Sequence, residues 1–335
     1  MASSEGLYET GTESNLPTPT LFTVRSEDLE RLNAREAVDF FRELLWAEAR
    51  TVALPTSKVH VSELIDTSDG GIDATVEGGL PESADLIKEG RTGYQIKASS
   101  AFKPWQQSAI KKELFGERSE PTRENLGSGI RDCLDEGGAY ILICFRQDPV
   151  DKQYRQAITN LTYFLKQCGY RDPKVDVWGQ STLIGFLTRF PSLSLQINGR
   201  HQYQFQTHRS WSLNDDMQKN FEAGEQQLEH ISALREELRG NNGAIHIRVG
   251  GEPGIGKTRL ILEATSDKDL RPLVLYCLKP ELLIGSELFN EILRDDNYFS
   301  TILVVDECDP ESTYFLWNMF KNRGARIKLN IWSVK

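Results

Sequence analysis

Cysteine is scarce in this chain of 335 residues, and its five cysteines are scattered without a CxxC pair. This pattern argues against a disulfide framework and a structural zinc site, and it favours a reducing compartment, the cytoplasm. Long apolar runs are also missing, because no stretch approaches the roughly 18 residues that a membrane helix needs. No basic residue precedes Arg25, so the start of the chain lacks the charged region of a secretory signal. We therefore expect a protein without membrane contacts.

Basic residues are also fewer than acidic residues in this chain. The chain has 39 Lys and Arg against 49 Asp and Glu, which gives a net charge of -10. This balance disfavours non-specific nucleic-acid binding by the whole surface, although a local basic patch can still hold a duplex. A hydrophobic share of 39% and a charged share of 26% are ordinary for globular protein, and the length favours two domains.

The pattern along the chain predicts four segments. Residues 1–20 are rich in small and polar side chains and are predicted to form a flexible arm. Residues 21–200 carry the order αβββαβ, with a first helix from Asn33 and strands at 58–61, 72–76, 93–97, 139–145 and 175–177. Residues 201–240 are predicted to be a linker dominated by one helix from Leu213 to Leu238. In residues 241–335 strands and helices alternate, which is typical of a parallel sheet covered by helices. The predicted fold class is α/β.

A glycine-rich loop provides the most specific motif. The sequence GEPGIGKT, Gly251 to Thr258, fits the phosphate-binding pattern GxxxxGK[ST] and lies between a predicted strand and a predicted helix. Backbone N–H groups around Gly251, Gly254 and Gly256 and the positive end of the helix would hold the phosphates of ATP. Lys257 would reach the β- and γ-phosphates, and the Thr258 hydroxyl would bind Mg²⁺.

A second nucleotide motif follows at residues 301–307, where an apolar strand ends in two acids. Asp306 would orient the water shell of the metal, and Glu307 would polarise the attacking water. The chain ends at Lys335, soon after this strand, so we expect it to contain only the first part of an NTPase module.

The first domain carries a different set of polar residues, typical of a metal-dependent nuclease. Asp73 closes the loop DGGID at the start of one predicted strand, and Gln95 and Lys97 lie two apart on the next. Residues i and i+2 of a strand share a face, so the three side chains are expected at one edge of the sheet. A divalent metal held by Asp73 and Gln95 would supply hydroxide, and Lys97 would position the water.

Charged side chains on two helices are further candidates. Glu36 and Glu43 are seven apart on the first helix, and either one could add a carboxylate to the nuclease site. Lys111 and Lys112 could contact phosphates, but a solvated helix face explains them equally well. Taken singly, each of these elements also has an ordinary structural explanation.

Together these motifs carry a family resemblance. The helical Glu, DGGID and YQIK resemble the PD-(D/E)xK superfamily, in particular its Mrr-like restriction-endonuclease branch, in which Gln can replace the acid of the second half-motif. The resemblance implies Asp73 as metal ligand and Gln95 with Lys97 as the QxK pair. The downstream module, from GGEPGIGKT to ILVVDE, resembles that of bacterial antiviral STAND (Avs) defence proteins with N-terminal nuclease effectors.

The resemblance implies a Mg²⁺-dependent endonuclease that cuts double-stranded DNA and is controlled by an ATPase in anti-phage defence. It further implies a homo-oligomer on activation and a phage protein as trigger, sensed by a C-terminal region that this sequence does not include. The alternative is a nucleotide-switched signalling or scaffold NTPase whose nuclease-like domain is an inactive interaction module. A nucleotide-dependent restriction translocase would need helicase motifs, and we find none.

Overall fold

The computed structural model describes residues 21–62, 70–80, 86–116, 120–200, 204–240, 245–294, 299–321 and the backbone of 328–334. The predicted arm at residues 1–20 and Asp69 lie outside these ranges. The described residues form a mixed α/β structure with two five-stranded sheets. Within them, no helix is both long and apolar enough to span a membrane.

The first sheet has the order β1-β2-β3-β4-β5. Antiparallel pairing joins β1 to β2 and β2 to β3, whereas β3, β4 and β5 are parallel. All five predicted strands are present, with β2 and β3 shifted or extended by a few residues: β1 Val59–Val61, β2 Ala74–Gly79, β3 Gly90–Lys97, β4 Ala139–Cys144 and β5 Lys174–Trp178. The fully buried β4 is apolar throughout, as a strand covered on both faces requires.

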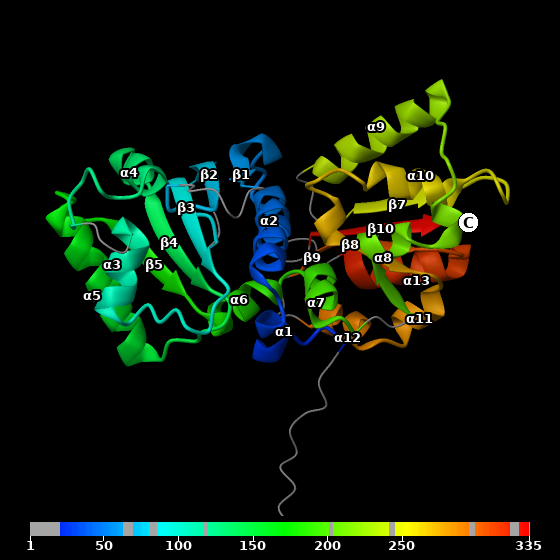
Figure 1. Cartoon of the computed structure of the whole chain (residues 1–335). Coiled ribbons are helices and arrows are strands. Elements are labelled where there is room, and N and C mark those ends of the chain that lie inside the picture. The colour runs from blue at the N-terminus through cyan, green and yellow to red at the C-terminus, as the bar shows by residue number, and fades with distance from the viewer. Residues whose placement is uncertain are drawn as a thin grey trace, which may run out of the picture.

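Helices cover both faces of this sheet (Figure 1). The outer face packs against α3 Gln107–Phe115, α4 Ser128–Asp135 and α5 Asp151–Gln167. The inner face packs against α2 Ala34–Thr51, with α1 Ser26–Glu30, α6 Gln180–Leu187 and α7 Pro191–Asn198 nearby; the short 3-10 turn η1 is Thr56–Lys58. The helix predicted from Gln180 to Phe190 ends earlier, at Leu187, and Pro191 occupies the first turn of α7, where its missing N–H costs nothing.

The second sheet has the order β6-β8-β9-β10-β7, and only β6 is antiparallel to its neighbour. Its strands are β6 Phe205–Thr207, β7 Ile245–Val249, β8 Val274–Cys277, β9 Ser300–Val305 and β10 Lys328–Val334. Its helices are α8 His208–Ser212, α9 Glu225–Arg239, α10 Lys257–Ala264, α11 Pro280–Ile284, α12 Glu287–Leu293 and α13 Pro310–Phe320, with 3-10 turns η2 Asp215–Met217 and η3 Arg271–Leu273. Because β10 lies between β7 and β9, the strands before the glycine-rich loop and before Asp306 are not adjacent.

The predicted helix from Leu213 to Leu238 is wrong over its first half. The helix α9 begins only after Gly224, whose backbone is extended. The N–H of Gly224 donates to the side chain of Gln227 at 3.0 Å. Further upstream, the carbonyls of Met217 and Lys219 accept hydrogen bonds from Arg259 of α10. These carbonyls are therefore used in a tertiary contact, which the helical periodicity of the apolar residues does not reveal.

The two sheets share one apolar core. α2 lies between them (Figure 1), and its buried side chains belong to the same cluster as residues of α9, α10 and β9. A buried ion pair reinforces this junction: Glu48 of α2 is 0% exposed, and its carboxylate lies 3.0 Å from the guanidinium of Arg189. The carbonyl of Arg189 in turn accepts from Ser300 N at 2.8 Å, at the start of β9. These contacts join α2 to the start of β9 through Arg189.

Candidate functional site

A glycine turn sets the position of the predicted nuclease residues. Gly70 and Gly71 have φ angles of +63° and +84°, a region that favours glycine. The carbonyl of Gly70 accepts from Gly129 N and Ile130 N, at 3.0 and 3.3 Å, at the start of α4. A Cβ on Gly70 would lie 2.4 Å from Gly129 N, so the turn can approach α4 only without a side chain. Asp73 follows this turn by two residues, so the turn fixes where its backbone lies.

Asp73 is anchored to β3. Its backbone N–H donates to the Tyr94 carbonyl at 2.8 Å, and its carboxylate oxygen Oδ2 accepts from Ile96 N at 2.6 Å. Since Ala74 pairs with Tyr94 in antiparallel register, Asp73 lies opposite Gln95. Directly opposed residues of antiparallel strands lie on the same face, with Cβ atoms roughly 5 Å apart. Asp73, directly before β2, and Gln95 of β3 therefore lie opposite each other, and their shared metal site stays a prediction.

Lys97 lies on the same face of β3, two residues beyond Gln95. Its ammonium is 2.6 Å from the Oε1 oxygen of Glu113 on α3 and 5.8 Å from the centre of the Phe102 ring. Glu113 is a carboxylate that our sequence reasoning missed, because its proximity depends on how α3 packs on the sheet. It follows Lys111 and Lys112, of which the first is half-buried and the second exposed.

Two buried polar atoms at this site lack a hydrogen-bond partner among the described residues: Gln95 Oε1 and the hydroxyl of Tyr140 on β4. The side chain of Gln95 is only 7% exposed. Burial raises the pKa of Tyr140 well above its usual value, and the nearby charges of Glu113 and Asp73 raise it further. Buried polar groups are normally paired, so an amide oxygen without a partner among the described residues, opposite a carboxylate, is a candidate cation ligand.

A small hard cation fits this donor set. Mg²⁺ takes oxygen ligands and is often held by one or two carboxylates while it retains several waters. The Asp73 carboxylate and the Gln95 amide oxygen are of this kind, and Glu113 offers a second carboxylate. No group of three His, Cys, Asp or Glu side chains suited to a metal occurs in the described part of the chain, so a binding site here depends on the amide oxygen.

Neither predicted helical glutamate reaches this site. Glu36 accepts from Asn33 N at 2.9 Å and so completes the N-terminal capping box of α2. Glu43 accepts from Gln196 at 2.6 Å and lies 3.8 Å from Arg271, toward the second sheet. The physical reason is that α2 packs on the opposite face of the sheet, against Tyr94 and its neighbours, and not on the Gln95 face.

The predicted phosphate-binding loop lies between β7 and α10. Gly254 and Gly256 have φ angles of +83° and +85°, which explains why glycine occupies both positions. The Lys257 ammonium donates to the carbonyls of Gly251 and Glu252 at 3.0 and 2.9 Å. In this arrangement the Lys257 ammonium is bonded to the loop's own backbone. To contact a bound phosphate it would have to leave these two carbonyls.

Thr258 and Asp306, the two residues predicted to hold the metal of the nucleotide, lie together. The Thr258 hydroxyl donates to Asp306 Oδ2 at 3.0 Å, across the sheet from α10 to the end of β9. The Asp306 side chain is buried at 8% exposure. Glu307 differs: it has a positive φ of 46°, is 62% exposed and lies 3.6 Å from the ammonium of Lys279. Its role in activating water stays a prediction.

Two aromatic residues that the sequence did not reveal support Asp306. The hydroxyl of Tyr276 on β8 donates to Asp306 Oδ2 at 2.9 Å. Burial and the neighbouring Asp306 carboxylate both raise the pKa of Tyr276, so the hydroxyl stays protonated as a donor. The Tyr276 ring stacks on Trp211 of α8 at 4.5 Å and 12°. Through this aromatic pair, α8 contacts the residue that donates to Asp306.

Comparison of the chain with family models, with curated proteins and with solved structures finds no match.

Proposed function

We propose that this chain is a Mg²⁺-dependent DNA endonuclease with a restriction-endonuclease-like αβββαβ domain, controlled by a STAND-type ATPase module. The observation that carries the proposal is that Asp73 lies opposite Gln95, whose buried amide oxygen has no hydrogen-bond partner among the described residues, with Lys97 on the same face. Mg²⁺ bound by these oxygens would lower the pKa of a water and neutralise the charge that develops on the phosphate.

The side chains around this centre have distinct tasks in the proposed reaction. Asp73 and Gln95 hold the cation at the end of β3, and the hydrogen bond from Ile96 N keeps one oxygen of Asp73 in place. Lys97 positions the attacking water and stabilises the phosphate, and its pairing with Glu113 sets the direction of its ammonium. Glu113 can also accept the proton of that water, because its carboxylate lies beside the Lys97 ammonium that positions the water.

The second half of the proposal is ATP binding by the loop from Gly251 to Thr258. Its support is the strand-loop-helix context together with the 3.0 Å bond between Thr258 and Asp306. ATP with Mg²⁺ would replace the carbonyls of Gly251 and Glu252 as the partners of the Lys257 ammonium. Anti-phage defence, a phage protein as trigger and assembly into a homo-oligomer that cuts both strands are parts of the same proposal and rest on the family resemblance.

The alternative is a nucleotide-switched signalling or scaffold NTPase with an inactive nuclease-like domain. One observation favours it: the 2.6 Å pair between Lys97 and Glu113 is also what a purely structural ion pair would look like. The two functions differ in whether these residues are needed for DNA cleavage.

A plasmid-nicking assay with Mg²⁺ or Mn²⁺ distinguishes them. Asp73→Ala and Lys97→Ala should abolish nicking, whereas Lys152→Ala, an exposed lysine on α5, should leave it at the parent rate. Lys257→Ala should weaken ATP binding in calorimetric titration while leaving the metal site intact. Nicking by Asp73→Ala and Lys97→Ala at the parent rate would refute the nuclease assignment, and unchanged ATP affinity in Lys257→Ala would refute the nucleotide assignment.

A further inference from the structure

A groove with a cavity volume of about 580 Å³ lies along the free edge of the first sheet. We call it the edge groove. Its walls are α2, the edge strand β1, the first residues of β2 and the turn that leads into η3. Because that turn belongs to the second half of the chain, the groove is formed jointly by the proposed nuclease and ATPase parts.

The lining of the edge groove is basic, in contrast to the net charge of -10 of the whole chain. Its ionisable side chains are Arg42, His60, Lys268, Arg271 and one acid, Asp73. An acidic protein that gathers its cations in one concave place creates a local positive potential there.

These cations are only partly neutralised by neighbouring acids. Arg42 pairs with Asp39 at 2.7 Å, but the Asp39 side chain is half exposed to solvent. Arg271 is 3.8 Å from Glu43, at the outer limit of an ion pair, and its Nε atom is buried without a hydrogen-bond partner among the described residues. Lys268 forms no ion pair with any described residue.

An aromatic side chain orients two of the cations. The Lys268 ammonium and the Arg271 guanidinium lie 5.7 and 5.1 Å from the centre of the Trp46 ring on α2. Cation–π contacts of this kind hold a charge in place without neutralising it. The groove therefore presents fixed donors to an anion.

The edge groove and the proposed metal site share Asp73, whereas Gln95 and Lys97 do not line the groove. Asp73 lines it, and the backbone carbonyl of Asp73 accepts from Ser62 N at 2.9 Å, beside the end of β1. Arg42 donates to the Ser62 carbonyl at 3.2 Å, so this arginine is tied to the same corner of the sheet. A nucleic-acid strand with one phosphate at Asp73 would place further phosphates toward Lys268 and Arg271.

We propose that the edge groove binds backbone phosphates of the DNA substrate next to the cleaved one, and that the ATPase half supplies two of its cations, Lys268 and Arg271. This inference rests on the proposed nuclease function. Phosphate contacts of this type position a duplex without reading its sequence. DNA binding by the nuclease domain is then complete only when the second half is docked against α2.

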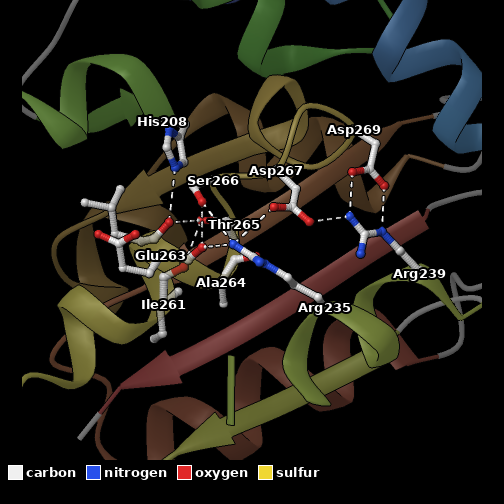
Figure 2. A network of polar contacts seen from close by, with 11 residues as sticks. His208, Arg235, Arg239, Ile261, Glu263, Ala264, Thr265, Ser266, Asp267 and Asp269 are labelled. Atoms are coloured by element: carbon white, nitrogen blue, oxygen red, sulfur yellow. Dashed lines mark hydrogen bonds and ion pairs between the residues drawn. The ribbon is translucent and has the colours of Figure 1, made fainter. Parts of the chain in front are cut away.

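Hydrogen bonds and ion pairs join α9 to the end of α10 and to the turn that carries these two cations (Figure 2). It follows α10, the helix after the glycine-rich loop, without a break. Arg235 of α9 donates to the carbonyls of Glu263 and Ala264 at 2.8 and 3.2 Å, and Arg239 lies 2.6 Å from Asp267 and 2.8 Å from Asp269. Lys268 and Arg271 therefore lie in the segment that follows α10, at the opposite end of this helix from the glycine-rich loop.

The test measures binding of a fluorescently labelled DNA duplex to the full chain by anisotropy, over a range of salt concentrations. Asp73→Ala serves as the background, so that no cleavage occurs during the titration. Lys268→Ala combined with Arg271→Ala should weaken binding equally on duplexes of unrelated sequence and reduce the slope of log affinity against log salt by about two. The control, Lys152→Ala with Lys166→Ala on α5, removes the same charge from exposed positions and should leave the slope unchanged.

The single variant Lys268→Gln keeps the test valid if loss of Arg271 disturbs folding, because Lys268 is exposed and its loss should lower the slope by about one. An unchanged slope in both the single and double variants overturns the inference, as does a parent that binds no DNA at low salt. If the intact parent fails to nick plasmid but the slope still falls, the groove is a DNA site and the proposed nuclease function is wrong. If the parent nicks and the slope does not change, only the groove is refuted.

Discussion

Gln95→Glu tests the proposed metal site through protein stability instead of cleavage. The substitution restores the acid that the superfamily resemblance leads one to expect at this position, and it adds almost no volume. In the absence of metal it places a carboxyl on a side chain that is only 7% exposed and lies opposite Asp73. Burial and the neighbouring like charge both disfavour ionisation of the new carboxyl and raise its pKa.

The magnitude follows from linkage. We assume that the new carboxyl stays protonated in the folded protein at pH 7 but ionises in the unfolded chain with a pKa of about 4.3. The free energy of unfolding then falls by about 1.36 kcal/mol for each pH unit between about 4.3 and 7, or roughly 3 to 4 kcal/mol in total. Attraction to Lys97 reduces this value. Because the folded-state pKa is raised, the loss is absent below about pH 4 and grows as the pH rises above the unfolded value.

The assay is urea denaturation at pH 4 and pH 7, each with chelator or with Mn²⁺. We expect Gln95→Glu to match the parent at pH 4, to be less stable at pH 7 in chelator, and to recover most of that loss with Mn²⁺, since a bound cation stabilises the folded state by mass action. Gln167→Glu, at an exposed position on α5, is the control and should show none of these effects. Stability at pH 7 that Mn²⁺ leaves unchanged in the variant would show that Gln95 does not face a cation site.

Two further predictions concern the second half and the junction. Tyr276→Phe removes the donor to Asp306 while keeping the aromatic ring, so the Mg²⁺-dependent part of ATP affinity should fall by roughly tenfold or more, as expected for a hydrogen bond to a charged group. Equal titrations of variant and parent with and without Mg²⁺ would contradict this. Arg189→Ala removes the cation beside the fully buried Glu48 and should cost about 3 to 5 kcal/mol of unfolding free energy, whereas Glu48→Gln with Arg189→Met should recover much of it. Urea denaturation checks both variants, and a loss below about 1 kcal/mol in Arg189→Ala would show that the pair is well solvated.

The parts of this protein that depend on local sequence were predictable. The glycines at 254 and 256 need a positive φ, and a strand-loop-helix order surrounds them, so the loop could be identified without tertiary contacts. The alternation of a strand likewise put Gln95 and Lys97 on one face, and the apolar strand β4 was recognisable by its lack of polar residues. In each case the physical constraint acts within a few residues.

Only the tertiary structure decided which distant side chains meet. Glu113 reaches Lys97 because of how α3 packs, and Tyr276 reaches Asp306 because β8 lies beside β9. Helical spacing made Glu36 and Glu43 equal candidates, yet α2 turns out to cover the other face of the sheet, toward the second half. The spacing of apolar residues predicts that one face of a helix or strand is buried, but not which element buries it. Packing between elements far apart in the chain therefore decided which side chains meet at each candidate site.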